Sequence, residues 1–229
     1  RLFYRTNIDL PTLSQLQNVV DNTNTLQLRA GNPDLGQSYT HRLGGRYRAA
    51  SAAKGTSFFV FASLSLVSNQ IANSTFIAPT DTILPEGITL VRGAQLIRPV
   101  NVAGAYNFRS FASYGFPVKA LKSNLNFNAG YTINNSPSLI NGVTNEALTH
   151  NINTGLTIGS NISKELDFTL GYALNYNTVF NSIQPQLNNN YYIHNANFRI
   201  NWLPIPALVF SSDVLYNAFA GLEDGFNQT

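Results

Sequence analysis

Over residues 165–177, large apolar side chains alternate with small or polar ones at every position. The apolar positions are Leu166, Phe168, Leu170, Tyr172, Leu174 and Tyr176. A helix would repeat its apolar residues every third or fourth position, whereas strict alternation is typical of a strand with one apolar and one polar face. Strands of soluble proteins usually have about five or six residues, and a tilted strand needs about 9–11 to cross a bilayer. The pattern therefore predicts a transmembrane β-strand.

Other segments continue this alternation, so we expect about nine long strands in the chain. Besides the strand at 165–177, they cover residues 2–10, 39–49, 57–69, 100–113, 121–134, 148–160, 191–202 and 207–217. No stretch reaches the roughly 18 consecutive apolar residues that suggest a membrane-spanning helix. The pattern predicts an all-β fold: an antiparallel, up-and-down transmembrane β-barrel segment, with residues 1–229 as a single domain.

The connections between these strands alternate in length along the chain. Short connections are expected at residues 51–55, 114–120, 161–164 and 203–206, and long ones at 11–37, 70–99, 135–146 and 179–190. Outer-membrane barrels have short periplasmic turns and longer extracellular loops. The alternation therefore favours a barrel that sits in a bacterial outer membrane.

Charged residues within the expected strands all occupy the polar positions. A charge that faces the middle of a bilayer costs about 2–4 kcal/mol for Arg or Lys, so the lipid face should exclude charges. The residues expected to face the lumen are Arg42, Arg46, Arg48, Arg109, Asp167, Arg199 and Asp213. Those expected to face lipid are Val60, Leu64, Phe127, Tyr131, Phe168, Leu170, Tyr172, Phe198 and Phe210.

A secreted soluble β module is the alternative, because one face of its strands would also be apolar. Charged residues make up 11% of this chain, against about 25% in a typical soluble domain. The water-facing side of a soluble sandwich usually carries Lys and Glu, whereas these strands carry Asn and Gly. The composition favours the barrel.

An odd number of strands does not fit a complete barrel of this kind. Bacterial single-chain barrels have an even number of strands, and unpaired strand edges are not tolerated in hydrocarbon. We therefore expect the chain to be a segment of a larger barrel, or one part of a split barrel.

Several functional classes find no support in the sequence. The chain has no Cys, a net charge of +3 and no basic run, so we expect no thiolate chemistry and no nucleic-acid partner. It contains no G-x-S-x-G, Walker A or dinucleotide-binding motif. His41, His150 and His194 lack the spacing of metal ligands. We expect neither an enzyme nor a bound cofactor or metal.

One region resembles a signature of the large outer-membrane β-barrels of Bacteroidetes, which are relatives of the TonB-dependent receptors. It comprises Pro-Thr-Leu-Ser-Gln-Leu-Gln at residues 11–17, Asp-Asn-Thr-Asn at 21–24, Gly-Asn-Pro-Asp-Leu at 31–35, and His41. Residues 221–228 resemble the loop that precedes the last few strands of these proteins. The chain departs from the family pattern at residues 36–38, where Gly-Gln-Ser replaces Lys-Pro-Glu, and at Thr25, which replaces a Pro.

The resemblance implies a parent barrel of about 22 strands with an N-terminal plug. The expected partners are outer-membrane lipid and the remaining strands and plug, or other subunits of a membrane complex. Two functions follow: import of a nutrient through the extracellular loops and a polar lumen, or anchoring of a surface or secretion complex by a non-transporting barrel. Arg42, Arg46 and Arg48 would then pair with acids on the plug or neighbouring strands, or bind an anionic solute.

Overall fold

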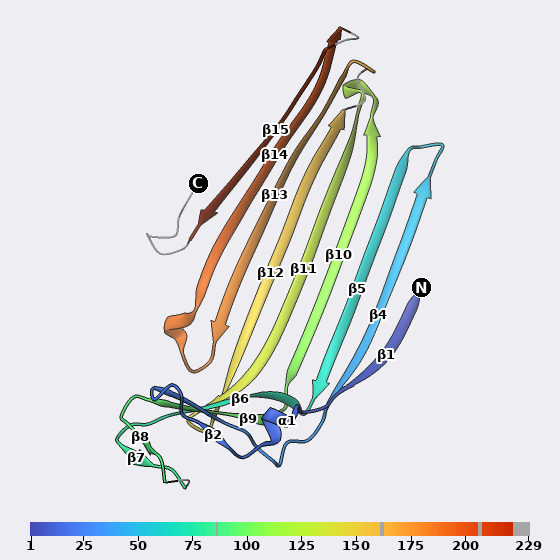
Figure 1. Cartoon of the computed structure of the whole chain (residues 1–229). Coiled ribbons are helices and arrows are strands. Elements are labelled where there is room, and N and C mark those ends of the chain that lie inside the picture. The colour runs from blue at the N-terminus through green and yellow to red at the C-terminus, as the bar shows by residue number, and fades with distance from the viewer. Residues whose placement is uncertain (86, 161–162, 206–207, 222–229) are drawn as a thin grey trace.

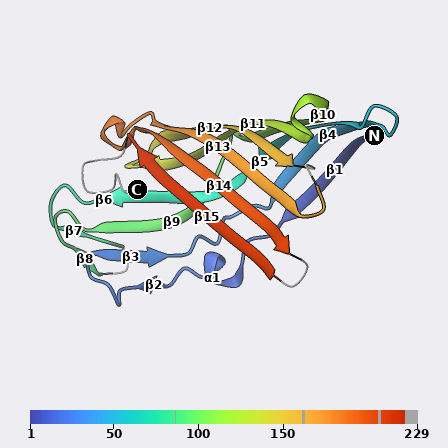
Figure 2. The ribbon, with the colours of Figure 1, turned by 90° about the horizontal axis from the view of Figure 1, so that it is seen from above.

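The computed structural model describes residues 1–85, 87–160, 163–205 and 208–221. Nine long strands form one antiparallel sheet in the order β1-β4-β5-β10-β11-β12-β13-β14-β15. They are β1 (Leu2–Asp9), β4 (Ser38–Ser51), β5 (Thr56–Ser68), β10 (Ala105–Val118), β11 (Ser123–Ile140), β12 (Val143–Ser160), β13 (Leu166–Asn181), β14 (Asn189–Ile205) and β15 (Leu208–Ala220). Figure 1 shows them side by side, and Figure 2 shows that the sheet is curved and twisted. The predicted all-β antiparallel fold is confirmed, and β1 and β15 do not pair with each other among the described residues.

The pairing register is continuous across the sheet, so each face can be followed from strand to strand. Leu170, for example, pairs with Ile158 on β12 and Phe198 on β14. Because side chains alternate between faces, this register places all nine residues expected to face lipid on one side, which we call the apolar face. It places the seven charged residues expected to face the lumen on the other side, the polar face.

The apolar face of the sheet does not pack against a core. Phe127 is 48% exposed, Leu170 44% and Phe210 54%, and Val60 and Phe168 are half-buried among their neighbours on the sheet. Soluble proteins rarely leave a contiguous apolar surface of this kind uncovered. The nine long strands, which we call the wall, thus expose an apolar face that suits contact with lipid.

The buried apolar core lies outside the wall, in a cap at one end of the long strands (Figure 1). The cap comprises residues 10–37 and 69–104. Its elements are α1 (Leu13–Leu16), β2 (Val20–Asp21), β3 (Gln27–Ala30), β6 (Gln70–Ile77), β7 (Thr82–Ile83), β8 (Thr89–Leu90) and β9 (Gln95–Val102). Its core residues are Leu28, Ala30, Ala78, Leu84, Leu90, Ala94 and Leu96.

The cap corrects two expectations about strand and loop boundaries. Residues 70–99 were expected to be a loop, but β6 and β9 pair along eight residues each. Pro99 is tolerated in β9 because β3 pairs only with Gln95, Leu96 and Ile97, so no ladder continues on that side of Pro99. The strand expected at 100–113 is in fact two strands, separated at Ala103 and Gly104, whose φ of 88° interrupts the pairing.

The expected loop at 135–146 is also wrong, because β11 and β12 continue to a two-residue turn. Asn141 and Gly142 have φ angles of 49° and 78°. Two positive φ angles match the tight turn whose twist suits a hairpin, and Asn-Gly is its preferred sequence. Between β13 and β14 the loop is shorter than the expected 179–190 and contains the helical turn η2 (Pro185–Leu187).

The short β4–β5 and β10–β11 connections lie at the opposite end of the long strands from the cap (Figure 1), whereas the two-residue Asn141–Gly142 turn lies at the cap end. The expected turn at 114–120 is shifted, since β10 extends to Val118 and η1 (Lys119–Leu121) follows. Two expected turns, 161–164 and 203–206, fall partly outside the described residues. Among the helices described, none is long and apolar enough to cross a membrane.

Candidate functional site

The signature segment begins with a helix-capping motif at the base of the cap. The backbone N–H of Thr12 donates to Oε1 of Gln15 at 2.8 Å, and the backbone N–H of Gln15 donates to Oγ1 of Thr12 at 3.3 Å. This reciprocal pair satisfies two donors that a helix start would otherwise leave unpaired. Thr12 and Gln15 therefore have a structural role as the start of α1.

The second part of the signature ties α1 to β9. A Cβ on Gly31 would overlap the carbonyl oxygen of Gln17, so only glycine fits there. The backbone N–H of Asn32 donates to the carbonyl of Gln15 at 2.6 Å, and its side-chain Nδ2 donates to the carbonyl of Pro99 at 3.1 Å. Oδ1 of Asn32 accepts from the N–H of Asp34 at 3.0 Å, a bond that Asn side chains commonly make in turns.

A hollow of about 500 Å³ lies in the cap, lined in part by Gln17, Asp21, Arg29 and Asn73. Asp21 accepts hydrogen bonds from the backbone N–H and the hydroxyl of Thr23, at 3.0 and 2.8 Å. These bonds, with a smaller contribution from the Arg29 charge, lower the pKa of the Asp21 carboxyl. The cap thus presents an ionised carboxylate beside a guanidinium at this hollow.

The connections at the cap end of the long strands contact one another. The N–H of Asn141 donates to the carbonyl of Thr75 at 2.9 Å, and Oδ1 of Asn141 accepts from the N–H of Ile77 at 2.7 Å. The N–H of Ile183 donates to Oδ1 of Asn145 at 3.1 Å. The cap, the tip of the β11–β12 hairpin and the loop after β13 therefore form one connected surface.

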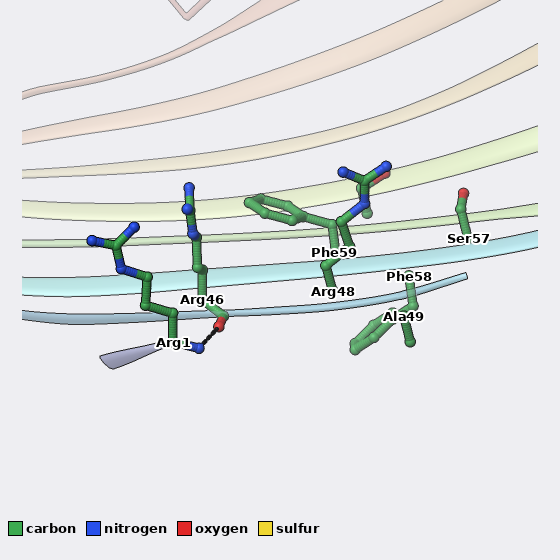
Figure 3. Close-up of a pocket in the computed structure, with 8 residues that line it drawn as sticks. Arg1, Arg46, Arg48, Ala49, Ser57, Phe58 and Phe59 are labelled. Atoms are coloured by element: carbon green, nitrogen blue, oxygen red, sulfur yellow. Dashed lines mark hydrogen bonds between the residues drawn. The ribbon is translucent and has the colours of Figure 1, made fainter. Parts of the chain in front are cut away.

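The polar face divides into two regions, and the first is rich in arginine and phenylalanine. This arginine region lies on β1, β4, β5 and β10, with Arg5, Arg42, Arg46, Arg48, Arg109, Phe3, Phe59, Phe61 and Phe111. Figure 3 shows Arg46, Arg48 and Phe59 on one side of the strands and Ala49 and Phe58 on the other. Phe59 and Phe61 were not predicted to lie on the polar face. The run Phe58-Phe59-Val60-Phe61, with apolar residues in both registers, was the signal for them.

The second region of the polar face, on β11 to β15, is mainly amide. Nδ2 of Asn151 donates to Oδ1 of Asn177 at 2.7 Å, and Nδ2 of Asn153 donates to Oδ1 of Asn175 at 2.6 Å. The remaining predicted lumen residues lie in this region. Arg199 forms an ion pair with Asp213, whereas Asp167 accepts from Oγ of Ser160 at 3.3 Å.

The three histidines share one arrangement on the apolar face. In each case Nδ1 shares a hydrogen bond of 2.8 Å with the hydroxyl of a tyrosine on the neighbouring strand. The pairs are Tyr4–His41, Tyr131–His150 and Tyr172–His194. Within the described part of the chain, no group of three His, Cys, Asp or Glu side chains could hold a metal ion. The histidines are therefore partners of tyrosines in this structure.

Comparison with known proteins shows a match to a protein family. A family model described as an outer membrane protein beta-barrel family matches residues 1–204 of the 229. Neither the curated proteins nor the solved structures contain a match.

Proposed function

This chain belongs to the outer membrane protein beta-barrel family, and from that premise we propose that it forms part of a barrel that imports a nutrient in the manner of a TonB-dependent receptor. Family membership places the protein in the bacterial outer membrane, in contact with lipid, and excludes the secreted soluble module. In such a barrel the chain would have a fixed orientation in the membrane, a surface that captures the solute and a polar lumen.

The direction follows from the two long connections, residues 10–37 and 69–104, that form the cap. In outer-membrane barrels the long loops are extracellular and the short turns periplasmic. The cap would then face the outside of the cell, and η1 the periplasm. Phe116 and Trp202 lie near the short-turn ends of β10 and β14, where an aromatic girdle would meet the inner edge of the membrane.

Lipid contact by the apolar face explains the tyrosine–histidine pairs. A polar atom in hydrocarbon has no water to bind, so it must be satisfied within the protein. The shared hydrogen bond satisfies the hydroxyl of Tyr172 and Nδ1 of His194 on that face. Each of the three pairs would in this way satisfy two polar atoms that face lipid.

Further strands are part of the proposal. The described sheet leaves an unpaired edge on β1 and another on β15. A membrane does not tolerate free strand edges, because their N–H and C=O groups would lack partners. We infer that more strands, from the same protein or from another subunit, pair with both edges and enclose the polar face as a lumen.

The observation that carries the import function is the folded cap above the polar face. The cap, the tip of the β11–β12 hairpin and the loop after β13 form a single surface through Asn32, Asn141 and Asn145. Small molecules are usually bound in clefts that are mostly apolar and carry a few fixed polar groups. A surface of this kind at the mouth of a polar wall suits capture of a solute and its transfer inward.

Import is tested in cells from which the gene has been deleted. The deletion should abolish accumulation of one class of labelled nutrient, and the intact gene should restore it. A proton uncoupler should block the restored accumulation, because the outer membrane has no energy source of its own. A variant in which residues 79–92 are replaced by a short Gly-Ser linker should reach the outer membrane without restoring uptake.

If the barrel instead anchors a surface complex, deletion of the gene should have the opposite effects. Uptake of every nutrient in the panel would be unchanged by the deletion, while a surface complex would be lost from the outer membrane. That outcome would replace import with anchoring and leave the family assignment intact.

A further inference from the structure

We propose that the arginine region of the polar face is a binding surface for a small anionic solute that carries two or more phosphate, sulfate or carboxylate groups. The inference deepens the import function, on which it rests, by naming the chemical class of the solute. The first observation is that two arginines of the wall lie side by side.

Arg5 and Arg42 are directly opposite each other on β1 and β4. Side chains in such positions are neighbours on the same face, and like charges there destabilise a sheet. Among the residues that the structure describes, only neutral contacts offset the repulsion. The guanidinium of Arg5 lies 5.4 Å from the centre of the Phe3 ring, and Nε of Arg42 donates to Oγ of Ser65 at 2.9 Å. An anion between the two arginines would turn this repulsion into a favourable contact.

Acids of the wall do not supply that anion. None of the five arginines of the region forms an ion pair with an acid among the residues that the structure describes. Asp9 is four residues from Arg5, or about 13 Å along β1, and accepts a hydrogen bond from Asn7. Asp213 is paired with Arg199. The positive charge of the region is therefore not neutralised within the described wall.

A hollow of about 260 Å³ lies where three of these arginines meet. Arg5, Arg42 and Arg109 line it together with Ser63, Ser65, Asn107, Phe3 and Phe61. Guanidinium groups bind oxyanions through paired hydrogen bonds, and the serine and amide groups add neutral donors. The volume is below the about 300–1,000 Å³ of most ligand pockets. The hollow thus fits a small solute, or the charged head of a larger one.

The arginines of β4 form a row along the strand, which suits a solute that moves through the lumen. Arg42, Arg46 and Arg48 follow one another along β4 from the cap end toward the short-turn end. Their spacing is about 13 Å and then about 7 Å. A solute that crosses the membrane through the lumen would move in this direction. Successive arginines would lower the electrostatic energy of an anion at each step.

The test measures binding of pyranine, a small fluorescent trianion, to the intact protein in nonionic detergent at low salt. Fluorescence anisotropy should show saturable binding that weakens as salt is added. Arg42→Gln and Arg109→Gln should each reduce the affinity by about tenfold or more, because each removes a charge-assisted contact.

The matched control is Arg199→Gln, which removes the same charge from the same face but outside the arginine region. Its affinity for pyranine should stay within about twofold of the unmodified protein, a change of under about 0.5 kcal/mol. Equal losses in all three variants would mean that only net charge matters and would overturn the proposal.

The proposal would also be overturned if an acidic protein segment occupied the arginine region. In that case pyranine would not bind, and Arg42→Gln and Arg109→Gln would lower the melting temperature of the intact protein without any added ligand. Failure of import gives a different result: pyranine would bind and respond to the arginine variants, while deletion of the gene would change no uptake. Uptake of a neutral nutrient without pyranine binding would refute the anion site and leave import standing.

Discussion

Arg199 and Asp213 face each other across β14 and β15, with Nε of the arginine 3.0 Å and Nη2 2.6 Å from the same carboxylate oxygen. The two side chains are 61% and 42% exposed. Arg42, on the same face of the sheet, has another arginine opposite it instead of an acid. On the polar face, the charge of Arg199 is therefore neutralised by an acid, whereas the arginines of the arginine region have no acid paired with them among the described residues.

We predict that breaking the exposed pair has little effect on stability. Arg199→Gln should lower the free energy of unfolding by less than about 1 kcal/mol, because water screens ion pairs at such exposure. Guanidinium titration of the protein in lipid vesicles measures this. A loss of several kcal/mol would show that the pair lies in a much drier lumen than its exposure indicates.

Gly31 is predicted to be essential for the packing of the cap. Gly31→Ala places a methyl group against the carbonyl oxygen of Gln17, and such crowding costs about 1–3 kcal/mol. Hydrogen exchange should become faster in the cap while the amides of the long strands keep their protection. The control is Gly36→Ala, whose new Cβ would meet Oδ1 of Asn101 at an ordinary 3.6 Å. Equal exchange in both variants would contradict this account of the cap.

Asn141 is predicted to act in two ways, as a turn residue and as an acceptor. Asn141→Gly keeps the positive φ but removes the acceptor for the N–H of Ile77, at a cost of about 0.5–1.5 kcal/mol. Asn141→Ala removes the acceptor and also strains the turn, which adds roughly 1 kcal/mol. Thermal unfolding of the two variants in the same detergent gives the difference. If the glycine variant were the less stable of the two, the turn conformation would not be the source of the strain.

The sidedness of the wall is tested with one strand. Leu170→Arg puts a charge on the apolar face and should cost about 2–4 kcal/mol in a bilayer if that face meets lipid. Ala173→Arg puts the same side chain on the polar face of β13 and should cost less than about 1 kcal/mol, because water can hydrate it. Folding yield in lipid vesicles compares the two. Similar losses would reject lipid contact at Leu170.

The strands of the wall were predictable because their signal is local. Alternation over residues 165–177 is enough to predict β13 and its two faces, and the continuous register then extends those faces across the sheet. The Asn141–Gly142 turn was also predictable, since the Asn-Gly pair favours it in any hairpin. Treating residues 135–146 as a loop overlooked that local signal.

The cap was not predictable in the same way, because its pairings are distant in sequence. β3 pairs in parallel with β9, which is more than sixty residues later, as in the pair of Gln27 with Gln95. Short strands without alternation do not indicate such partners. The tyrosine–histidine pairs and the hollow at Arg109 were not predictable for the same reason. Each depends on which residues of neighbouring strands are side by side, and only the register decides that.

The position of the apolar core divides the molecule between two solvents. Leu28 and Leu90 are excluded from water inside the cap, so the cap can be stabilised by the hydrophobic effect in an aqueous setting. The wall has no such interior and depends on hydrocarbon to cover its apolar face. Exchanging one detergent for another should therefore loosen or tighten the wall while the cap keeps its fold.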